Sequence, residues 1–160
     1  MAADELATYL NDHLAGSTTG VELARRLQRD HQGTPLGTVM AELAEEVEQD
    51  RATLQDLMER LGVDRSTLRQ AAGAVAERLA RLRTGERLTG SPHLSRLLET
   101  ELLSLGVEGK LLMWKVLAAA AAADARLAAT DFGRLIDRAR SQRERLEPHR
   151  LAAAAAVVAA

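Results

Sequence analysis

Apolar residues recur at spacings of three and four along almost the whole chain, which is the period of helices packed on one side. The pattern predicts helices over residues 4–29, 36–61, 66–83, 93–124 and 131–157. The segment Gly33-Thr34-Pro35 ends the first helix, and Gly62 is a natural C-terminal cap for the second. The short connection makes these two helices antiparallel neighbours. We therefore predict an all-α protein, a single domain over residues 1–160, built as an up-down four-helix bundle with an extra crossover helix.

The predicted helix 93–124 carries two apolar lines on different faces. The line taken to face inward comprises Leu94, Leu98, Leu105, Leu112 and Val116. The second line comprises Leu103, Val107, Leu111 and Trp114. A helix with two apolar faces needs two partners. The second line is therefore a predicted interface, covered by the crossover helix or by a second subunit in a homodimer.

Four polar residues interrupt the predicted inward stripes, one in each long helix. They are His13, Asp50, Glu108 and Arg143, and Glu101 lies close to the same faces. Folding each hairpin about its loop brings them within about one helical turn, roughly 5 Å, of one layer. His, Asp and Glu are suitable ligands for iron or manganese, so a metal site is one interpretation. The other is a buried, charge-compensated network, favoured because Arg143 is permanently charged and would compete with a dication for the carboxylates. A pocket for a small polar ligand is a third interpretation.

Three segments resemble the small bacterial ferritin-like proteins of unknown function: YLNDHLAGSTTGVELARRL, LAEEVEQDRATLQDLMERLG and LLETELLSLGVEGKLLMWKVL. The resemblance runs over most of the chain. It implies ferritin-like connectivity, in which two helical hairpins are joined by a long crossover. Many members of the wider superfamily hold two metal ions with two Glu residues and two Glu-x-x-His pairs.

The metal motif of that superfamily is incomplete here. No Glu-x-x-His occurs in the chain, and the nearest segment is Glu147-Pro148-His149. Glu22 lies about 140° from the centre of the apolar stripe by helical geometry, so we expect it to point to solvent. We therefore expect no cofactor, with iron or manganese bound by His13, Asp50, Glu101 and Glu108 as the alternative.

The run of residues 57–70 resembles a helix-turn-helix, because a helix ends at Gly62 and Ser66 opens another. The interpretation competes with an ordinary glycine cap followed by an ordinary N-cap. The formal net charge of the whole chain is −2, which argues against nucleic acid as a partner. DNA binding is thus a second alternative function.

Composition narrows the remaining classes. The chain contains no cysteine, which excludes thiol catalysis and a disulfide framework and suits a reducing compartment. No phosphate loop, nucleophile elbow or His-Glu-x-x-His motif is present. The first residues lack the pattern of a signal peptide, and no apolar run is long enough to span a bilayer. We expect a cytoplasmic protein that is not an enzyme, and the sequence indicates no particular small-molecule ligand.

Two further local patterns carry expectations. Gly16 and Gly20 stand four apart in the first helix, a spacing that predicts close packing of another helix. Pro148 lies inside the last predicted helix and should kink or end it, at a cost of about 3 kcal/mol if the helix continues. Thr130 is the predicted N-cap of that helix.

Overall fold

The computed structural model describes residues 3–64 and 91–159 and forms a bundle of long helices. In that part of the chain the helices are α1 (Ala3–Asp30), α2 (Pro35–Leu61), α4 (Pro92–Ala120) and α5 (Phe132–Ala159). No strand occurs among these residues. The all-helical four-helix prediction is confirmed. The predicted crossover helix 66–83 lies outside the described residues.

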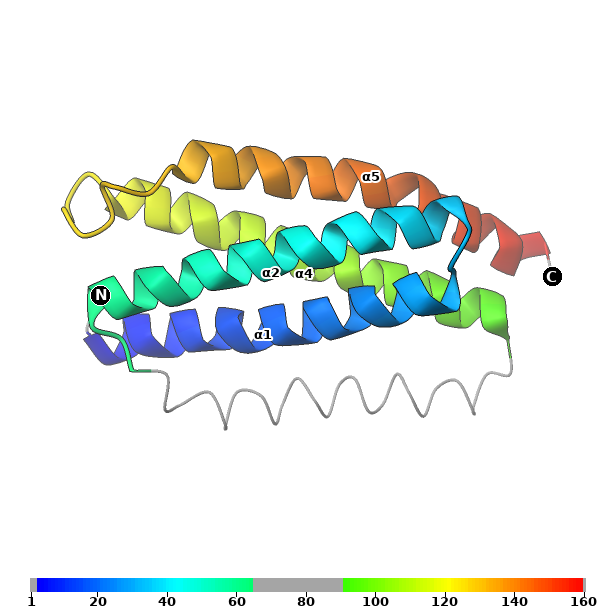
Figure 1. Ribbon diagram of the computed structural model, residues 1–160, viewed down its shortest axis with the longest axis horizontal. Coiled ribbons are helices and arrows are strands. Elements are labelled where there is room, and N and C mark those ends of the chain that lie inside the picture. Colours follow the sequence, from blue (N-terminus) through cyan, green and yellow to red (C-terminus); the bar gives the residue numbers. More distant parts are fainter. Residues whose placement is uncertain (1–2, 65–90, 160) are drawn as a thin grey trace.

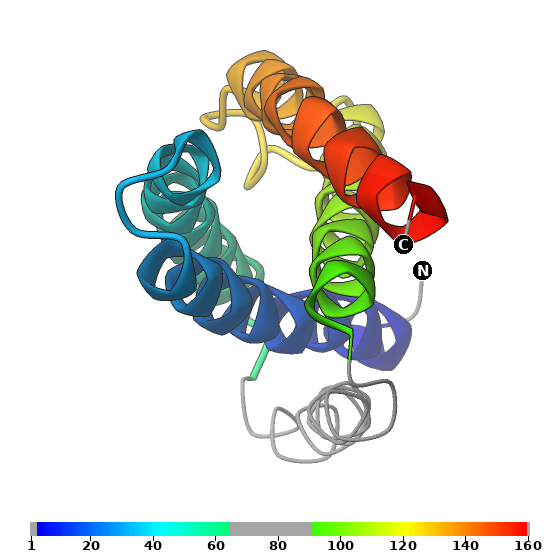
Figure 2. The same ribbon diagram turned by 90° about the vertical axis from the view of Figure 1, so that its right-hand side faces the viewer.

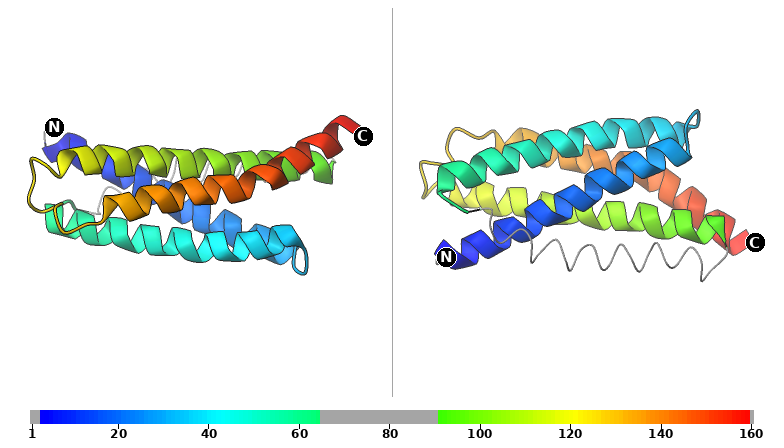
Figure 3. Two further views of the ribbon diagram at one scale, coloured as in Figure 1. Left: turned by 90° about the horizontal axis from the view of Figure 1, so that it is seen from above. Right: turned by 60° about the horizontal axis from the view of Figure 1, so that its bottom comes forward.

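The helices form two antiparallel hairpins, α1–α2 and α4–α5, lying side by side (Figure 1). Seen end-on, α1 lies between α2 and α4, and α5 lies diagonally across from α1 (Figure 2). Each helix runs antiparallel to both of its neighbours. The two turned views show that α1 crosses the other helices at an angle (Figure 3). The α4–α5 connection lies at the end where α2 finishes.

Local capping explains why the helices begin and end where they do. The Thr34 side chain accepts a hydrogen bond from the backbone N–H of Gly37 at 3.2 Å, and Pro35 occupies the first turn of α2. Gly62 ends α2 with φ 70° and ψ 26°, a left-handed conformation that glycine adopts without steric cost. The predicted glycine cap is confirmed.

The last two helices differ from the prediction at their ends. α5 continues through Pro148 to Ala159, close to the predicted range 131–157, whereas α4 ends at Ala120 instead of residue 124. The predicted N-cap Thr130 is wrong. The N-cap of α5 is Asp131, whose Oδ1 accepts from the backbone N–H of Arg134 at 3.0 Å. Thr130 instead accepts a 2.8 Å hydrogen bond from Arg60, which ties the α4–α5 connection to the end of α2.

The core consists of two apolar clusters, one toward each end of the bundle. One gathers Leu10, Leu54, Met58 and Leu117 around Trp114 and Phe132, whose ring centroids are 6.4 Å apart. The other is built from aliphatic side chains such as Leu27, Met40, Leu43 and Leu146. Between the two apolar clusters, in the middle of the bundle, the buried side chains are charged or polar instead of apolar. The candidate site lies there.

Gly37 is the glycine that the fold requires most. A Cβ atom there would lie 2.2 Å from the backbone oxygen of His31 and 2.8 Å from its carbonyl carbon. Gly37→Ala must therefore displace the α1–α2 turn, and we expect a loss of about 1–3 kcal/mol in the free energy of unfolding. Urea denaturation measures it. Gly109→Ala is the matched control: its Cβ meets nothing within 4 Å, so helix propensity alone should stabilise it by about 0.5–1 kcal/mol.

Candidate functional site: a buried charge layer beside a cavity

A buried layer of charged and amide groups separates the two apolar clusters. Asp50 of α2 is 1% exposed, Gln142 of α5 is 0% exposed, and Lys110 of α4 is 9% exposed. The Lys110 ammonium donates to Asp50 Oδ2 and to Gln142 Oε1, both at 2.5 Å. Arg138 pairs with the other oxygen of the same Asp50 carboxylate. One buried carboxylate thus serves two cations.

The layer extends toward the surface between α2 and α5. Gln142 Nε2 donates to Glu46 Oε2 at 2.9 Å. Arg145 then bridges Glu46 at 2.5 Å and Glu42 at 2.9 Å. The layer is neutral in total, because it contains three carboxylates and three cations: Asp50, Glu46 and Glu42 with Lys110, Arg138 and Arg145. The ion pairs are not one to one. At the inner end two cations share the carboxylate of Asp50, and at the outer end two carboxylates share Arg145.

Burial perturbs the ammonium at the centre of this layer. It lowers the pKa of Lys110, an effect that the neighbouring Asp50 carboxylate opposes. The hydrogen bond and the ion pair to Asp50 favour the ammonium form. An ammonium group has three N–H bonds, and Asp50 and Gln142 use two of them. The third has no acceptor among the described residues.

A cavity of about 240 Å³ lies directly against the inner end of the layer, between α1, α2 and α4. Asp50 and Lys110 form part of its wall, with Val47, Leu54, Val107 and Trp114. Its volume exceeds the roughly 150 Å³ of an apolar cavity able to hold benzene. At the same volume for each non-hydrogen atom as benzene has in that cavity, about 25 Å³, it accommodates about ten non-hydrogen atoms.

Four glycines line the cavity. Gly16 and Gly20 of α1 and Gly106 and Gly109 of α4 all line it. Among the described residues, a Cβ atom at Gly16, Gly106 or Gly109 would meet nothing within 4 Å, and one at Gly20 would meet Val47 at 3.8 Å. Gly16 and Gly106 are exposed, whereas Gly109 is half-buried. The expected close helix packing at Gly16 stays a prediction.

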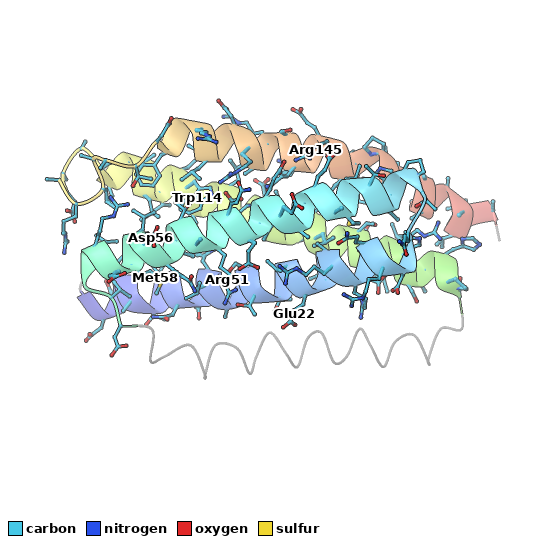
Figure 4. All side chains as sticks on the ribbon, in the orientation of Figure 1. Glu22, Arg51, Asp56, Met58, Trp114 and Arg145 are labelled. Atoms are coloured by element: carbon cyan, nitrogen blue, oxygen red, sulfur yellow. The ribbon has the colours of Figure 1, made fainter. Side chains whose placement is uncertain are left out.

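His13 and Arg51 border the same cavity. The His13 ring packs edge-on against Tyr9, with centroids 4.7 Å apart. Burial lowers the pKa of His13, while nearby Asp12 raises it less, so the ring is neutral at pH 7. Arg51 pairs with Glu48 at 3.1 Å through one terminal nitrogen. Figure 4 shows Arg51 on α2 and Trp114 on α4, with Glu22 projecting from the outside of α1, as expected.

The five predicted site residues are not gathered in one layer. Asp50 and His13 border the cavity, but Glu108 and Arg143 form a 2.6 Å ion pair on the outside, with side chains 37% and 50% exposed. Glu101 also lies outside, 3.4 Å from Arg150. Arg143 is therefore not the buried cation. Within residues 3–64 and 91–159, no three acidic, histidine or cysteine side chains are placed to hold a metal ion.

The cations of the true layer, Lys110 and Arg138, and the amide of Gln142 were missed. A signal for two of them was present in the sequence. Lys110 falls on the line of Leu103, Val107, Leu111 and Trp114, and Gln142 fits the spacing of Leu135, Ala139 and Leu146. Choosing those lines as the inward faces would have placed both residues in the core.

The two apolar lines of α4 are exchanged relative to the prediction. Leu103, Val107, Leu111 and Trp114, the predicted interface, are 0–4% exposed and form core. Leu98, Leu105, Leu112 and Val116, predicted to face inward, are 38–70% exposed. The inward line is the one that also carries Lys110. The residues predicted for the homodimer interface are therefore core, and the homodimer itself stays a prediction.

The structure also bears on the remaining sequence expectations. None of the described helices is sufficiently long and apolar to cross a membrane. Residues 65–70, where the second helix of the helix-turn-helix segment 57–70 would begin, lie outside the described residues. DNA binding therefore stays a prediction. Comparison of the chain with protein-family models, with curated proteins and with solved structures gives no match.

Proposed function

We propose that this protein is a non-enzymatic helical bundle that binds a small, largely apolar molecule in the cavity between α1, α2 and α4. The observation that carries the proposal is the glycine wall. Each mid-helix glycine costs about 0.5–1 kcal/mol relative to alanine. At Gly16 and Gly106, which are exposed, and at Gly109, which is half-buried, no atom of the described residues lies within 4 Å of the position that a Cβ would take. Packing among residues 3–64 and 91–159 gives no reason for these glycines, and a bound molecule would supply one.

The surroundings of the cavity support binding over catalysis. Asp50, the buried carboxylate on its wall, is held by Lys110, Arg138 and Gln142. A carboxylate occupied in this way is a poor general base. Apolar side chains such as Leu23, Leu103 and Met113 supply most of the remaining wall, as expected of a ligand pocket with a few fixed polar groups.

We also propose that the connectivity is of the ferritin-like kind implied by the resemblance. The support is that α2 and α4 run in the same direction (Figure 1), so the chain between them must connect opposite ends of the bundle. A long connection of this sort separates such bundles from those with short loops throughout. In such a bundle the charge-compensated layer would occupy the middle of the bundle, between the helices.

The test of ligand binding uses 1-octanol, a neutral probe of nine non-hydrogen atoms that suits the cavity volume. Titration should raise the melting temperature and change the fluorescence of Trp114, the sole tryptophan of the chain, which lines the cavity. Gly109→Leu should abolish both responses because its side chain fills the space. Gly109→Ala, which adds one methyl group, should keep them.

Two results would contradict the proposal. One is a parent protein that shows no response to 1-octanol up to its solubility. The other is binding that persists unchanged both in Gly109→Leu and in Gly20→Leu, which narrows the cavity from the α1 side. Gly20→Leu is included because the leucine side chain at position 109 could point away from the cavity and leave it open.

A further inference from the structure

We propose that the molecule bound in this cavity is a small carboxylic acid, with its carboxylate on Lys110 and its apolar body along the glycine wall of α1 and α4. This inference rests on the proposed binding function and specifies the class of ligand. It is carried by the uneven charge of the buried layer and by the unused hydrogen-bonding capacity of Lys110.

The charge distribution comes first. The cavity touches the layer only at its inner end, through Asp50 and Lys110. There the single carboxylate of Asp50 is shared by Lys110 and Arg138, while the next acid, Glu46, is itself paired with Arg145. One negative charge beside Lys110 would therefore give each of the two inner cations its own carboxylate.

The hydrogen bonds of Lys110 also favour an anionic ligand. Lys110 has one N–H bond left after Asp50 and Gln142, and 11% of its side chain remains exposed. A ligand oxygen that accepts this bond would gain a charge-assisted interaction in a poorly hydrated place. Gln142 and Asp50 fix the ammonium in position, so little ordering is required on binding.

The other charged groups around the cavity do not reverse this balance. Arg51 adds a second positive charge, partly offset by Glu48. His13 is held in its neutral form by burial. Asp12 borders the cavity but is exposed to solvent, where its repulsion of a bound anion is screened. A cationic ligand, by contrast, would meet Lys110 without a free carboxylate to receive it.

The size of the cavity limits the acid. About ten non-hydrogen atoms correspond to a medium-chain or small aromatic carboxylate, and a long-chain fatty acid exceeds the volume. Octanoate has ten non-hydrogen atoms and differs from 1-octanol mainly in its terminal charge. The pair therefore isolates the contribution of the carboxylate from that of the apolar body.

The experiment compares octanoate and 1-octanol at pH 7 by calorimetry and Trp114 fluorescence, in the full chain and in Lys110→Met. We expect octanoate to bind the parent roughly 10- to 100-fold more tightly than 1-octanol. In Lys110→Met the preference should disappear while 1-octanol affinity changes less than about threefold. Lys110→Gln, which keeps a hydrogen-bond donor without the charge, should retain an intermediate preference and covers the case in which Lys110→Met does not fold.

The outcomes separate the two proposals. Equal affinity of the parent for both probes, with both lost in Gly109→Leu, would overturn the carboxylate assignment and leave the binding cavity intact. A preference for octanoate that survives in Lys110→Met and Lys110→Gln would also overturn it. If neither probe binds the parent, the proposed function itself fails.

Discussion

Replacing Asp50 by alanine is expected to lower the free energy of unfolding by about 3–5 kcal/mol. Asp50 is 1% exposed and is the carboxylate shared by Lys110 and Arg138. Its removal leaves the buried ammonium of Lys110 with only an amide oxygen, that of Gln142, as partner. An uncompensated charge in the interior is far more costly than a lost surface interaction. Urea denaturation followed by tryptophan fluorescence measures the change.

Arg143→Ala is the control for this prediction, since Arg143 and Glu108 form an ion pair whose side chains are 50% and 37% exposed. Exposed pairs contribute only about 0.2–1 kcal/mol. The double variant Asp50→Leu/Lys110→Met should recover much of the stability lost in Asp50→Ala, because apolar groups replace the buried pair. Equal losses for Asp50→Ala and Arg143→Ala would show that the layer is not buried as described.

The difference between Asp50 and Arg143 shows how far the sequence could predict the site. Asp50 was correctly placed inside because the α2 stripe, Leu43, Val47, Leu54 and Leu57, is regular on both sides of it. In α5 the stripe is ambiguous, since position 142 and position 143 both follow Ala139 at helical spacing. A shift of one residue turns a side chain by about 100°. That rotation decides whether Gln142 or Arg143 enters the core.

The helices themselves were well predicted for a different reason. Their ends depend on local chemistry that the sequence states directly: Gly62 in a left-handed conformation, Thr34 before Pro35, and Ser91 before Pro92. The faces of α4 were exchanged because both lines are leucine-rich, and hydrophobicity alone cannot rank them. The buried line is the one that includes Trp114, which is 0% exposed. Lys110 lies on that line, and a charged side chain there makes the buried face look less apolar than it is.

The cavity could not have been predicted from one helix at a time. It exists because Gly16 and Gly20 of α1 face Gly106 and Gly109 of α4 at the level of the charged layer. The relative height of α1 and α4 is a tertiary property that follows from the packing of both hairpins. The glycine pairs were visible in the sequence, but small residues more often mark close contact than open space. Only the arrangement of α1, α2 and α4 shows whether these glycines lie in close contact or beside open space.

Trp114→Ala is expected to cost about 3–5 kcal/mol in the free energy of unfolding. Trp114 is fully buried in the core cluster that also contains Leu14, Leu57 and Phe132, and it forms part of the cavity wall. Its removal would open a space continuous with the existing cavity of about 240 Å³, so neighbouring side chains could fill little of it. Chemical denaturation followed by circular dichroism measures the loss, because the variant lacks the fluorescent reporter.

Trp114→Phe separates the volume of this side chain from its polar atom. The indole N–H of Trp114 is buried and has no acceptor in the described part of the chain, and a buried donor without a partner costs about 1–3 kcal/mol. Phenylalanine loses some packing but removes that donor, so we expect a change of less than about 1.5 kcal/mol. Adding indole should restore part of the stability of Trp114→Ala by occupying the enlarged cavity, and should affect Trp114→Phe much less. If Trp114→Phe proved as destabilising as Trp114→Ala, the indole N–H would have to be satisfied in the folded protein, by water or by a bound molecule in the cavity.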